Sequence, residues 1–254
     1  MGIIEKFDLS GRTAIVTGAS KGIGLAIAEA FGQQGANVVI SSRKQEACDE
    51  VAEEFAKQGI QAKGIACHMG DFDTIPKLVD QTVEAFGSID VIVNNAATNP
   101  VFGGVEEADP GAFDKIMDVN VKGPWALCKA ALPHLKEVKG SIINISSIEG
   151  ITPGQGLGLY SVSKSALIAL TKVQAREWGK AGVRANVICP GLVETKFSEA
   201  LTSNEHILKH VMVKQALPDV AQPIDIAGLA LLLATDASGF LTGGVYTADG
   251  GYTI

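Results

Sequence analysis

Apolar residues gather along this chain in short unbroken runs, separated by longer stretches with helical spacing. The runs cover residues 13–17, 37–41, 90–94, 141–146 and 183–189, and within them apolar side chains hardly alternate with polar ones. Strands of a parallel sheet show this pattern when helices cover both faces, because neither face meets water. Between the runs, apolar residues recur every three or four positions, as at Ile23, Ile27, Ala30 and Phe31. The alternation predicts one α/β domain over residues 1–254, with a doubly wound parallel sheet between two helical layers.

Residues 194–219 interrupt this alternation. The segment is more polar than its surroundings and precedes an apolar helix expected at 224–234. A long segment that follows a strand in an α/β fold often covers the ligand site. We therefore predict a substrate lid at 194–219, with a plain surface excursion as the alternative.

A glycine-rich turn joins the first strand to the first helix. It reads Thr17-Gly-Ala-Ser-Lys-Gly-Ile-Gly24. Glycine allows positive φ angles and lets the backbone approach a ligand closely, and the helix that follows offers free N–H groups to a pyrophosphate. Its position after the first strand of a βαβ unit predicts a dinucleotide site, although glycine spacing alone is a weak signal.

Tyr160 and Lys164 are four residues apart in a stretch with helical character. Such a spacing places both on one helix face, about 6 Å apart along the axis. Free tyrosine has a pKa near 10, and a neighbouring ammonium group favours the phenolate and lowers that pKa. The pair therefore predicts a proton donor and acceptor, Tyr160, whose pKa is lowered by Lys164.

Taken together, these motifs resemble those of the short-chain dehydrogenases/reductases over essentially the whole chain. Asn94-Asn-Ala-Ala97, Asn120, Ser147 and Pro190-Gly191 complete the family's set of motifs, in the family's order. The resemblance implies a Rossmann-type sheet and an oxidoreductase. Finer similarity, in Ser41-Ser-Arg-Lys-Gln45 and Asn99-Pro-Val-Phe-Gly103, is to the NADP-dependent retinal and carbonyl reductases.

The same resemblance implies roles for four catalytic residues. Ser147 would orient the substrate carbonyl and stabilise its developing negative charge, and the family interval favours it over Ser146. Tyr160 would transfer the proton, Lys164 would also bind the nicotinamide ribose, and Asn120 would hold a water in a proton relay. Asparagine is a poor mid-helix residue, so Asn120 is also expected to bend its helix; a purely structural polar role is the alternative.

The expected cofactor is NADP(H), in preference to NAD(H). NAD-dependent members carry a carboxylate at the end of the second strand, where this chain has Ser42 followed by Arg43. A serine and a guanidinium can bind the 2′-phosphate, and Lys21 adds a second cation. The full set of implied cofactor contacts is Gly18, Ser20, Lys21, Gly22, Ile23, Gly24, Ser42, Arg43, Met69, Asp71, Asn95, Ala96, Tyr160, Lys164, Pro190, Gly191, Val193 and Thr195.

One position departs from the family pattern. Many members place an aspartate after the third strand to receive the adenine amino group, but this chain has His68 there. Adenine recognition is then expected from the backbone of Met69 or from Asp71. On the substrate side, we expect Asn99, Glu149, Gln155 and Phe197 to line the pocket.

Composition excludes several other classes of protein. The net charge of −7 shows no basic excess, so a dedicated nucleic-acid binder is not expected. The longest strongly apolar run, 226–234, is too short to span a membrane, and no secretory signal is found at the start. Four scattered cysteines indicate reduced thiols and a cytoplasmic location. His206 and His210 lack a third ligand, so we predict no metal.

The predicted function is hydride transfer between NADP(H) and a small-molecule carbonyl or secondary alcohol. Reduction of a 3-oxoacyl thioester is one alternative, and it would require a basic surface near the pocket. A non-catalytic dinucleotide sensor is the other, and the intact Ser147, Tyr160 and Lys164 speak against it. Apolar helices expected at 113–135 and 166–178, together with the 243–254 tail, predict a homotetramer.

Overall fold

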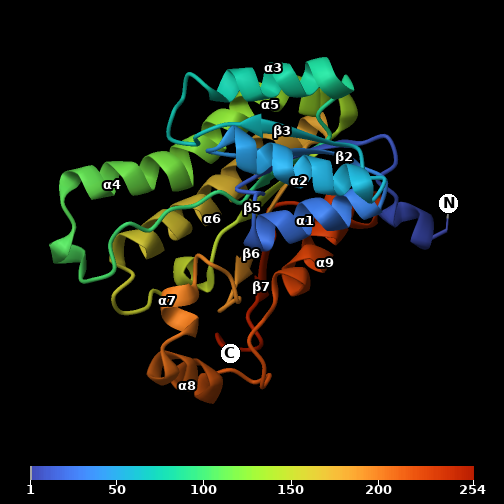
Figure 1. Ribbon diagram of the computed structural model, residues 1–254. Coiled ribbons are helices and arrows are strands. Elements are labelled where there is room, and N and C mark those ends of the chain that lie inside the picture. Colours follow the sequence, from blue (N-terminus) through green and yellow to red (C-terminus); the bar gives the residue numbers. More distant parts are fainter. Residues whose placement is uncertain (1) are drawn as a thin grey trace.

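The structure, a computed structural model, describes residues 2–254 and is built around one parallel sheet (Figure 1). Seven strands lie in the order β3-β2-β1-β4-β5-β6-β7, and every neighbouring pair is parallel. The strands are β1 (Thr13–Thr17), β2 (Asn37–Ser42), β3 (Ala62–Ala66), β4 (Val91–Asn94), β5 (Ser141–Ile145), β6 (Arg184–Pro190) and β7 (Val245–Ala248). The doubly wound α/β fold predicted from the apolar runs is confirmed.

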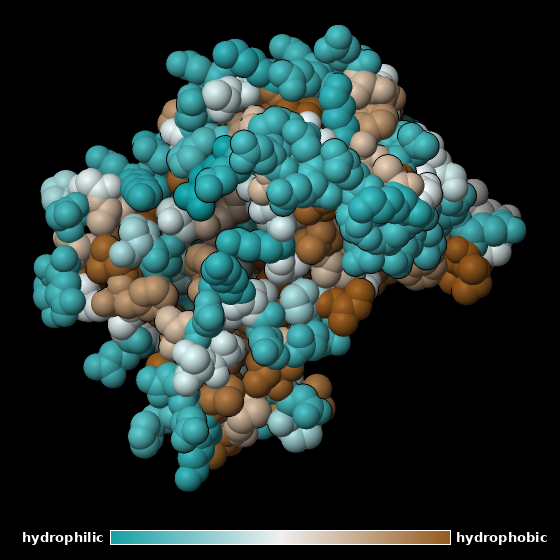
Figure 2. Space-filling view, in the orientation of Figure 1, coloured by the Kyte–Doolittle hydropathy of each residue, from teal (hydrophilic) through white to brown (hydrophobic). Residues whose placement is uncertain are grey.

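Helices cover both faces of the sheet. They are α1 (Gly22–Gln33), α2 (Gln45–Lys57), α3 (Ile75–Phe86), α4 (Pro110–Met117), α5 (Gly123–Val138), α6 (Gly158–Trp178), α7 (Glu199–Thr202), α8 (Glu205–Lys214) and α9 (Pro223–Ala234). One buried core joins α1, α2 and α9 to the sheet, and a second joins α3, α5 and α6 to the opposite face. Figure 2 shows the outer side of α2 as largely hydrophilic, as its exposed Glu50, Glu53 and Glu54 require.

The apolar runs mark the central strands and miss the two edge strands. β1, β4 and β5 are buried along their whole length, whereas β3 and β7 keep most residues only partly buried. An edge strand has one neighbour instead of two and less helical cover, so its sequence tolerates Lys63, Gly64 and Thr247.

The helix expected at 113–135 is two helices. Between α4 and α5 the chain makes a single π-helical turn, Asp118–Lys122, with Asn120 at its centre. Such turns insert one extra residue into a helix and often occur at functional sites. The expectation that Asn120 bends its helix agrees with this geometry.

The segment 194–219 leaves the sheet after β6 and returns before α9. It contains α7 and α8, and its two ends are joined where Glu194 N–H donates to the Ala221 carbonyl at 2.8 Å. Figure 1 shows α7 and α8 projecting beyond the carboxyl ends of the strands. The segment therefore lies beside the edge of the sheet at which α/β proteins bind ligands.

Candidate active site

A large cavity opens at the carboxyl ends of the strands, between β1 and β4. The order of strands reverses there, since β2 and β3 follow on one side and β5, β6 and β7 on the other. Its volume is about 1330 Å³, and its walls come from the loops after β1, β2, β3, β4, β5 and β6 and from the 194–219 segment. Because β1 and β4 are neighbours whose following loops diverge, a crevice forms between those loops. The cavity extends from the glycine-rich turn to residues of α6 and of the 194–219 segment.

The glycine-rich turn is held close to the end of β4. Asn95 donates from Nδ2 to the Thr17 carbonyl at 2.9 Å, and the N–H groups of Asn95 and Ala96 each donate to Thr17 Oγ1 at 3.1 Å. Gly18 has φ +65°, and a Cβ there would lie 2.9 Å from the Ala96 Cα. Only glycine fits this position without moving the backbone.

The first turn of α1 is open to the cavity. Lys21 is the N-cap residue, and its side chain makes no capping hydrogen bond. The N-terminal N–H groups are therefore available, together with the positive end of the helix dipole. Gly18, Ser20, Lys21, Gly22 and Ile23 all line the cavity here. A helix start without a cap beside a backbone cradle fits a pyrophosphate, so these residues fit a dinucleotide.

The end of β2 places hydroxyl and cationic groups beside this turn. Ser20 Oγ donates to Ser42 Oγ at 3.2 Å, and Ser42, Arg43 and Lys21 all line the cavity. Arg43 and Lys21 are exposed, and neither makes an ion pair with any residue between 2 and 254. The three side chains together fit a phosphate group.

The structure separates the residues expected to recognise adenine. His68 and Met69 line the cavity, whereas Asp71 lies outside its lining and accepts a hydrogen bond from the Asp73 N–H at 3.2 Å. His68 Nδ1 accepts from the Gly70 N–H at 3.1 Å, which leaves Nε2 as the ring's other polar atom. Of the two groups expected to replace the family's aspartate, only Met69 is in place.

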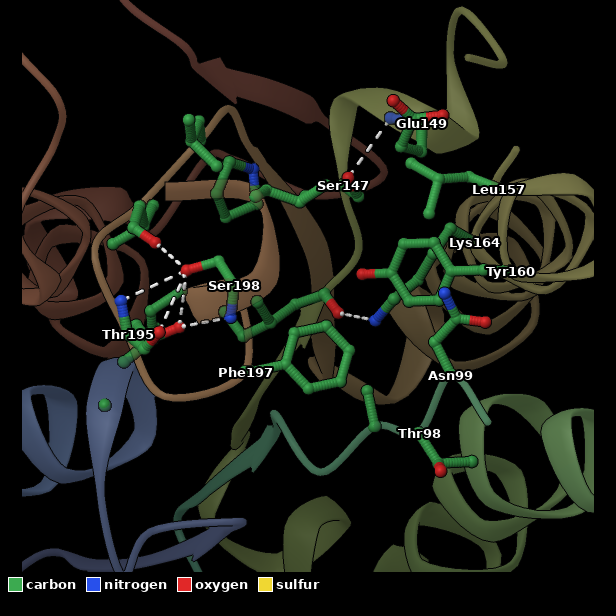
Figure 3. A pocket seen from close by; sticks show the side chains of 18 of the residues that line it. Thr98, Asn99, Ser147, Glu149, Leu157, Tyr160, Lys164, Thr195, Phe197 and Ser198 are labelled. Atoms are coloured by element: carbon green, nitrogen blue, oxygen red, sulfur yellow. Dashed lines mark hydrogen bonds between the residues drawn. The ribbon is translucent and has the colours of Figure 1, made fainter. Parts of the chain in front are cut away.

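Tyr160 and Lys164 lie on the inner face of α6, as their spacing predicts (Figure 3). Lys164 is only 2% exposed; its Nζ donates to the Ile145 carbonyl at 2.8 Å and lies 5.5 Å from the centre of the Tyr160 ring. Burial lowers the pKa of Lys164 to about 8. The ammonium is thus tied to the end of β5, under the face of the phenol.

The pKa of Tyr160 differs from the expectation. Burial raises it above the ordinary value, a hydrogen bond with Ser147 partly lowers it, and the charge of Glu149 raises it further. Lys164 does not lower it in the structure described here. The reason is geometric, since the ammonium faces the ring and the Ile145 carbonyl, and desolvation of the phenolate outweighs its remote charge.

Ser147 follows β5 and begins the short 3-10 turn Ile148–Gly150. Its Oγ accepts a hydrogen bond from the Glu149 N–H at 3.1 Å. Ser147 also lines the cavity, where its hydroxyl forms the hydrogen bond that partly lowers the pKa of Tyr160. Its neighbour Ser146 instead donates to the Lys164 carbonyl at 2.9 Å, so Ser146 ties β5 to α6.

Asn120 is buried behind the cavity wall and does not line it. Its Nδ2 donates to the Thr98 carbonyl and to Ser163 Oγ, both at 3.0 Å, and its Oδ1 accepts from the Thr98 N–H at 2.8 Å. These bonds occupy both amide hydrogens. The side chain therefore ties the loop after β4 to α6.

Most of the other predicted residues meet at the cavity. Those that line it are Asn95, Ala96, Asn99, Glu149, Gln155, Pro190, Gly191, Val193, Thr195 and Phe197. Gly24 does not line it: a Cβ there would lie 2.5 Å from Asn95 Nδ2, so this glycine serves close packing of α1 on the turn. Phe197 stacks obliquely on Tyr160, with ring centroids 6.1 Å apart and planes at 41°.

Sequence reasoning missed several lining residues. Leu157, Lys214 and Tyr252 belong to three separate segments and come together only in the folded chain. No local motif marks them. His206 and His210 also line the cavity, and no group of metal-binding side chains occurs among residues 2–254.

Comparison with known proteins places this geometry in a family. The family model described as enoyl-(acyl carrier protein) reductase matches residues 18–253. Dehydrogenase/reductase SDR family member 4 of Oryctolagus cuniculus is 37% identical over 251 residues, which cover 98% of this chain and 96% of that protein. Tropinone reductase-like 3 of Erythroxylum coca is 41% identical over 241 residues, covering 95% of this chain and 93% of that protein.

Solved structures agree. A gluconate 5-dehydrogenase from Burkholderia cenocepacia, in complex with NADP and tartrate, superposes with a TM-score of 0.95 at 28% identity, covering 99% of each chain. The chain belongs to the short-chain dehydrogenase/reductase family. It is an oxidoreductase that transfers a hydride between a nicotinamide cofactor and a carbonyl or alcohol substrate.

No helix within residues 2–254 has the length and apolar character needed to cross a membrane.

Proposed function

We propose that this chain is an NADP(H)-dependent carbonyl reductase acting on small molecules, with Tyr160, Ser147 and Lys164 as its catalytic residues. The observation that carries the proposal is the convergence of these three side chains on one cavity whose other half is built for a dinucleotide phosphate. The bound cofactor supplies or accepts the hydride. The protein orients the carbonyl, manages the proton and stabilises charge.

Ser147 and Tyr160 act together on the substrate oxygen. Ser147 Oγ is held by the Glu149 N–H, and its hydroxyl proton donates to the carbonyl and stabilises the negative charge that develops there. Tyr160 donates its phenolic proton to the same oxygen during reduction and removes it during oxidation. A raised pKa keeps the phenol protonated before reduction.

Lys164 and Asn120 position the groups that carry out this proton transfer. Lys164 is fixed by the Ile145 carbonyl under the Tyr160 ring, where it also reaches the part of the cavity expected to hold the nicotinamide ribose. Asn120 holds α6 to the loop after β4 through Ser163 and Thr98. We assign it a positioning role for Tyr160 and Asn99.

Three observations support NADP(H) over NAD(H). Ser42, Arg43 and Lys21 line the cavity, no carboxylate lies among the lining residues at the end of β2, and NADP is bound in solved structures of relatives. A carboxylate there would repel a 2′-phosphate, whereas a guanidinium binds it with two parallel hydrogen bonds.

Free buried thiols at Cys48, Cys67, Cys128 and Cys189 are consistent with the cytoplasmic location that we also propose.

The proposal is tested by Tyr160→Phe in the full chain. We expect a loss of turnover of at least about 100-fold, the usual contribution of a general acid, with NADPH affinity within about twofold of wild type by fluorescence titration. Tyr252→Phe removes a second phenolic hydroxyl that lines the same cavity and should keep most of the activity. Wild-type turnover in Tyr160→Phe would refute the assignment.

A further inference from the structure

The cavity is strongly cationic in a chain that is acidic overall. The protein has 21 Lys and Arg against 28 Asp and Glu. The charged side chains that line the cavity are nevertheless Lys21, Arg43, Lys115, Lys164, Lys196 and Lys214, against the single carboxylate Glu149. A surface with this imbalance attracts anions and raises their local concentration.

Half of these cations have no part in cofactor binding or proton transfer. Lys21 and Arg43 adjoin the expected phosphate site, and Lys164 lies under Tyr160. Lys115 on α4, Lys196 before α7 and Lys214 at the end of α8 come from three separate parts of the chain and line the same cavity. None of the three makes an ion pair with a carboxylate within residues 2–254.

The single carboxylate is already engaged. Glu149 Oε2 accepts from the Gly154 N–H at 2.6 Å and from Ser161 Oγ at 3.0 Å, which fastens the loop before α6 to the first turn of that helix. Figure 3 shows Glu149 beside Ser147, at the catalytic end of the cavity. Among residues 2–254, Glu149 makes no ion pair with a lysine of the cavity.

One face of α8, in the expected lid segment, turns polar side chains toward the cavity at helical spacing. His206, His210 and Lys214 recur every four residues and all three line the cavity, as do the apolar Ile207 and Val211 between them. Lys214 Nζ lies 5.5 Å from the centre of the Tyr252 ring, which itself lines the cavity. The ammonium is thus held against an aromatic face at the mouth. The acidic lid residues Glu199 and Glu205 do not line the cavity.

We infer that the substrate of this reductase carries an anionic group, a carboxylate or a phosphate, which Lys214 binds at the lid end of the cavity while the carbonyl lies at Ser147 and Tyr160. The inference rests on the proposed function and names the substrate class of that site. Ile207 and Val211 would contact the apolar part of the molecule between its two polar ends.

The test compares ketones that differ only in charge. The full-length enzyme is assayed with a series of keto acids of increasing chain length and with their methyl esters, and kcat/KM is measured for each pair. We expect the acid to exceed its ester by at least about tenfold at the length that reaches the lid, as for one charged hydrogen bond. A second pair, 3-oxobutanoyl pantetheine with and without its terminal phosphate, shows whether the anion is a phosphate.

Variants of α8 locate the contact. Lys214→Gln should lower kcat/KM for the preferred anion about tenfold and leave the ester unchanged, and Lys214→Arg should restore most of the loss. The matched control is Lys209→Gln, since Lys209 is exposed on the same helix and does not line the cavity. Added salt should weaken turnover of the anion and not of the ester.

Several outcomes would overturn the inference. One is that the neutral compound is reduced as well as, or better than, the anion in both pairs. Another is that Lys214→Gln lowers kcat/KM equally for the anion and for the neutral compound. The third is that Lys209→Gln has the same effect as Lys214→Gln. If no ketone is reduced, the proposed function fails, and calorimetric titration of acid and ester into the NADP⁺-loaded enzyme still decides the charge preference. Turnover of neutral ketones alone would leave the reductase assignment standing and remove the anion site.

Discussion

At the scale of single residues, burial controls the chemistry of the catalytic pair. Desolvation raises the pKa of Tyr160 and lowers that of Lys164 to about 8, so both side chains are driven toward their neutral forms. The protein alone therefore does not prepare a phenolate. A raised tyrosine pKa suits proton donation in reduction, and removal of a proton in oxidation requires further positive charge at the site.

The buried ammonium should cost stability, and the cost should depend on pH. Below pH 8 Lys164 is charged in both the folded and unfolded states, and its burial costs on the order of 3 kcal/mol. Between pH 8 and its unfolded value of 10.5 the unfolded chain binds more protons, so the stability of the wild type rises with pH there. We predict that inactive Lys164→Met is more stable than wild type at pH 7.

Urea unfolding at pH 7 and pH 10 measures this difference. The advantage of Lys164→Met should shrink at pH 10, and Lys172→Met, an exposed position on the same helix, should show no such dependence. A variant that is less stable than wild type at pH 7 would show that the bond to the Ile145 carbonyl outweighs the desolvation.

We propose that one or two side chains also decide the preference for NADP(H) over NAD(H). We predict that Arg43→Ala lowers kcat/KM for NADPH by roughly 10- to 150-fold, the value of one charged hydrogen bond, and changes that for NADH little. Lys44→Ala is the matched control, because Lys44 is exposed next to Arg43 and does not line the cavity. Equal losses with both cofactors, or wild-type efficiency with NADH, would count against a 2′-phosphate contact.

At the scale of elements, the π turn between α4 and α5 gives Asn120 its position. The extra residue points the amide at Thr98 and Ser163, so one side chain joins the loop after β4 to α6. Thr98 and Asn99 line the same cavity as Tyr160, and Figure 3 shows Asn99 beside Tyr160. The catalytic face of α6 and the loop after β4 are thus positioned by the same group.

Removing that amide should therefore affect both stability and activity. Asn120→Ala leaves the Thr98 N–H and carbonyl without partners, and we expect a loss of about 1–3 kcal/mol in the free energy of unfolding. Turnover should fall as well, because Asn99 and Tyr160 lose their common support. Ser163→Ala removes only one of the three bonds and should cost less by both measures. Wild-type stability in Asn120→Ala would refute the positioning role.

At the scale of the whole molecule, large apolar side chains are exposed on α4, α5 and α6 and, separately, on α9 and just after it. Phe113, Trp125, Val162 and Val173 are each more than 40% exposed on α4, α5 and α6. Ile224, in the first turn of α9, is 60% exposed, and Phe240, just after the 3-10 turn Asp236–Ser238 that follows α9, is fully exposed. Patches of this kind on a folded protein mark association sites. Two such patches are what a tetramer with twofold axes requires.

We accordingly propose a homotetramer, with a mass by light scattering of four times the 26.4 kDa chain. Trp125→Glu and Phe240→Asp should each disrupt one interface and yield a dimer. Val213→Asp, which changes an exposed apolar residue of the lid helix outside both patches, should leave the tetramer intact. A monomer at micromolar concentration would contradict the proposal.

Local features could be predicted from the order of residues alone. The four-residue interval fixes Tyr160 and Lys164 on one face of a helix, and glycine at 18 is dictated by backbone geometry in a tight turn. The central strands were recognisable because a strand buried on both faces must be continuously apolar. Each of these leaves a local signature in the residue types or their spacing, so it can be recognised before the fold is known.

Other features depend on segments that meet only in the folded chain. Lys214 and Tyr252 reach the cavity because α8 and the end of the chain are folded against it, and no pattern along the sequence encodes that meeting. The pKa of Tyr160 in the protein alone follows its burial and the direction in which the Lys164 ammonium is tied, and the spacing of the two residues determines neither. Burial and charge act through space, and tertiary packing determines both.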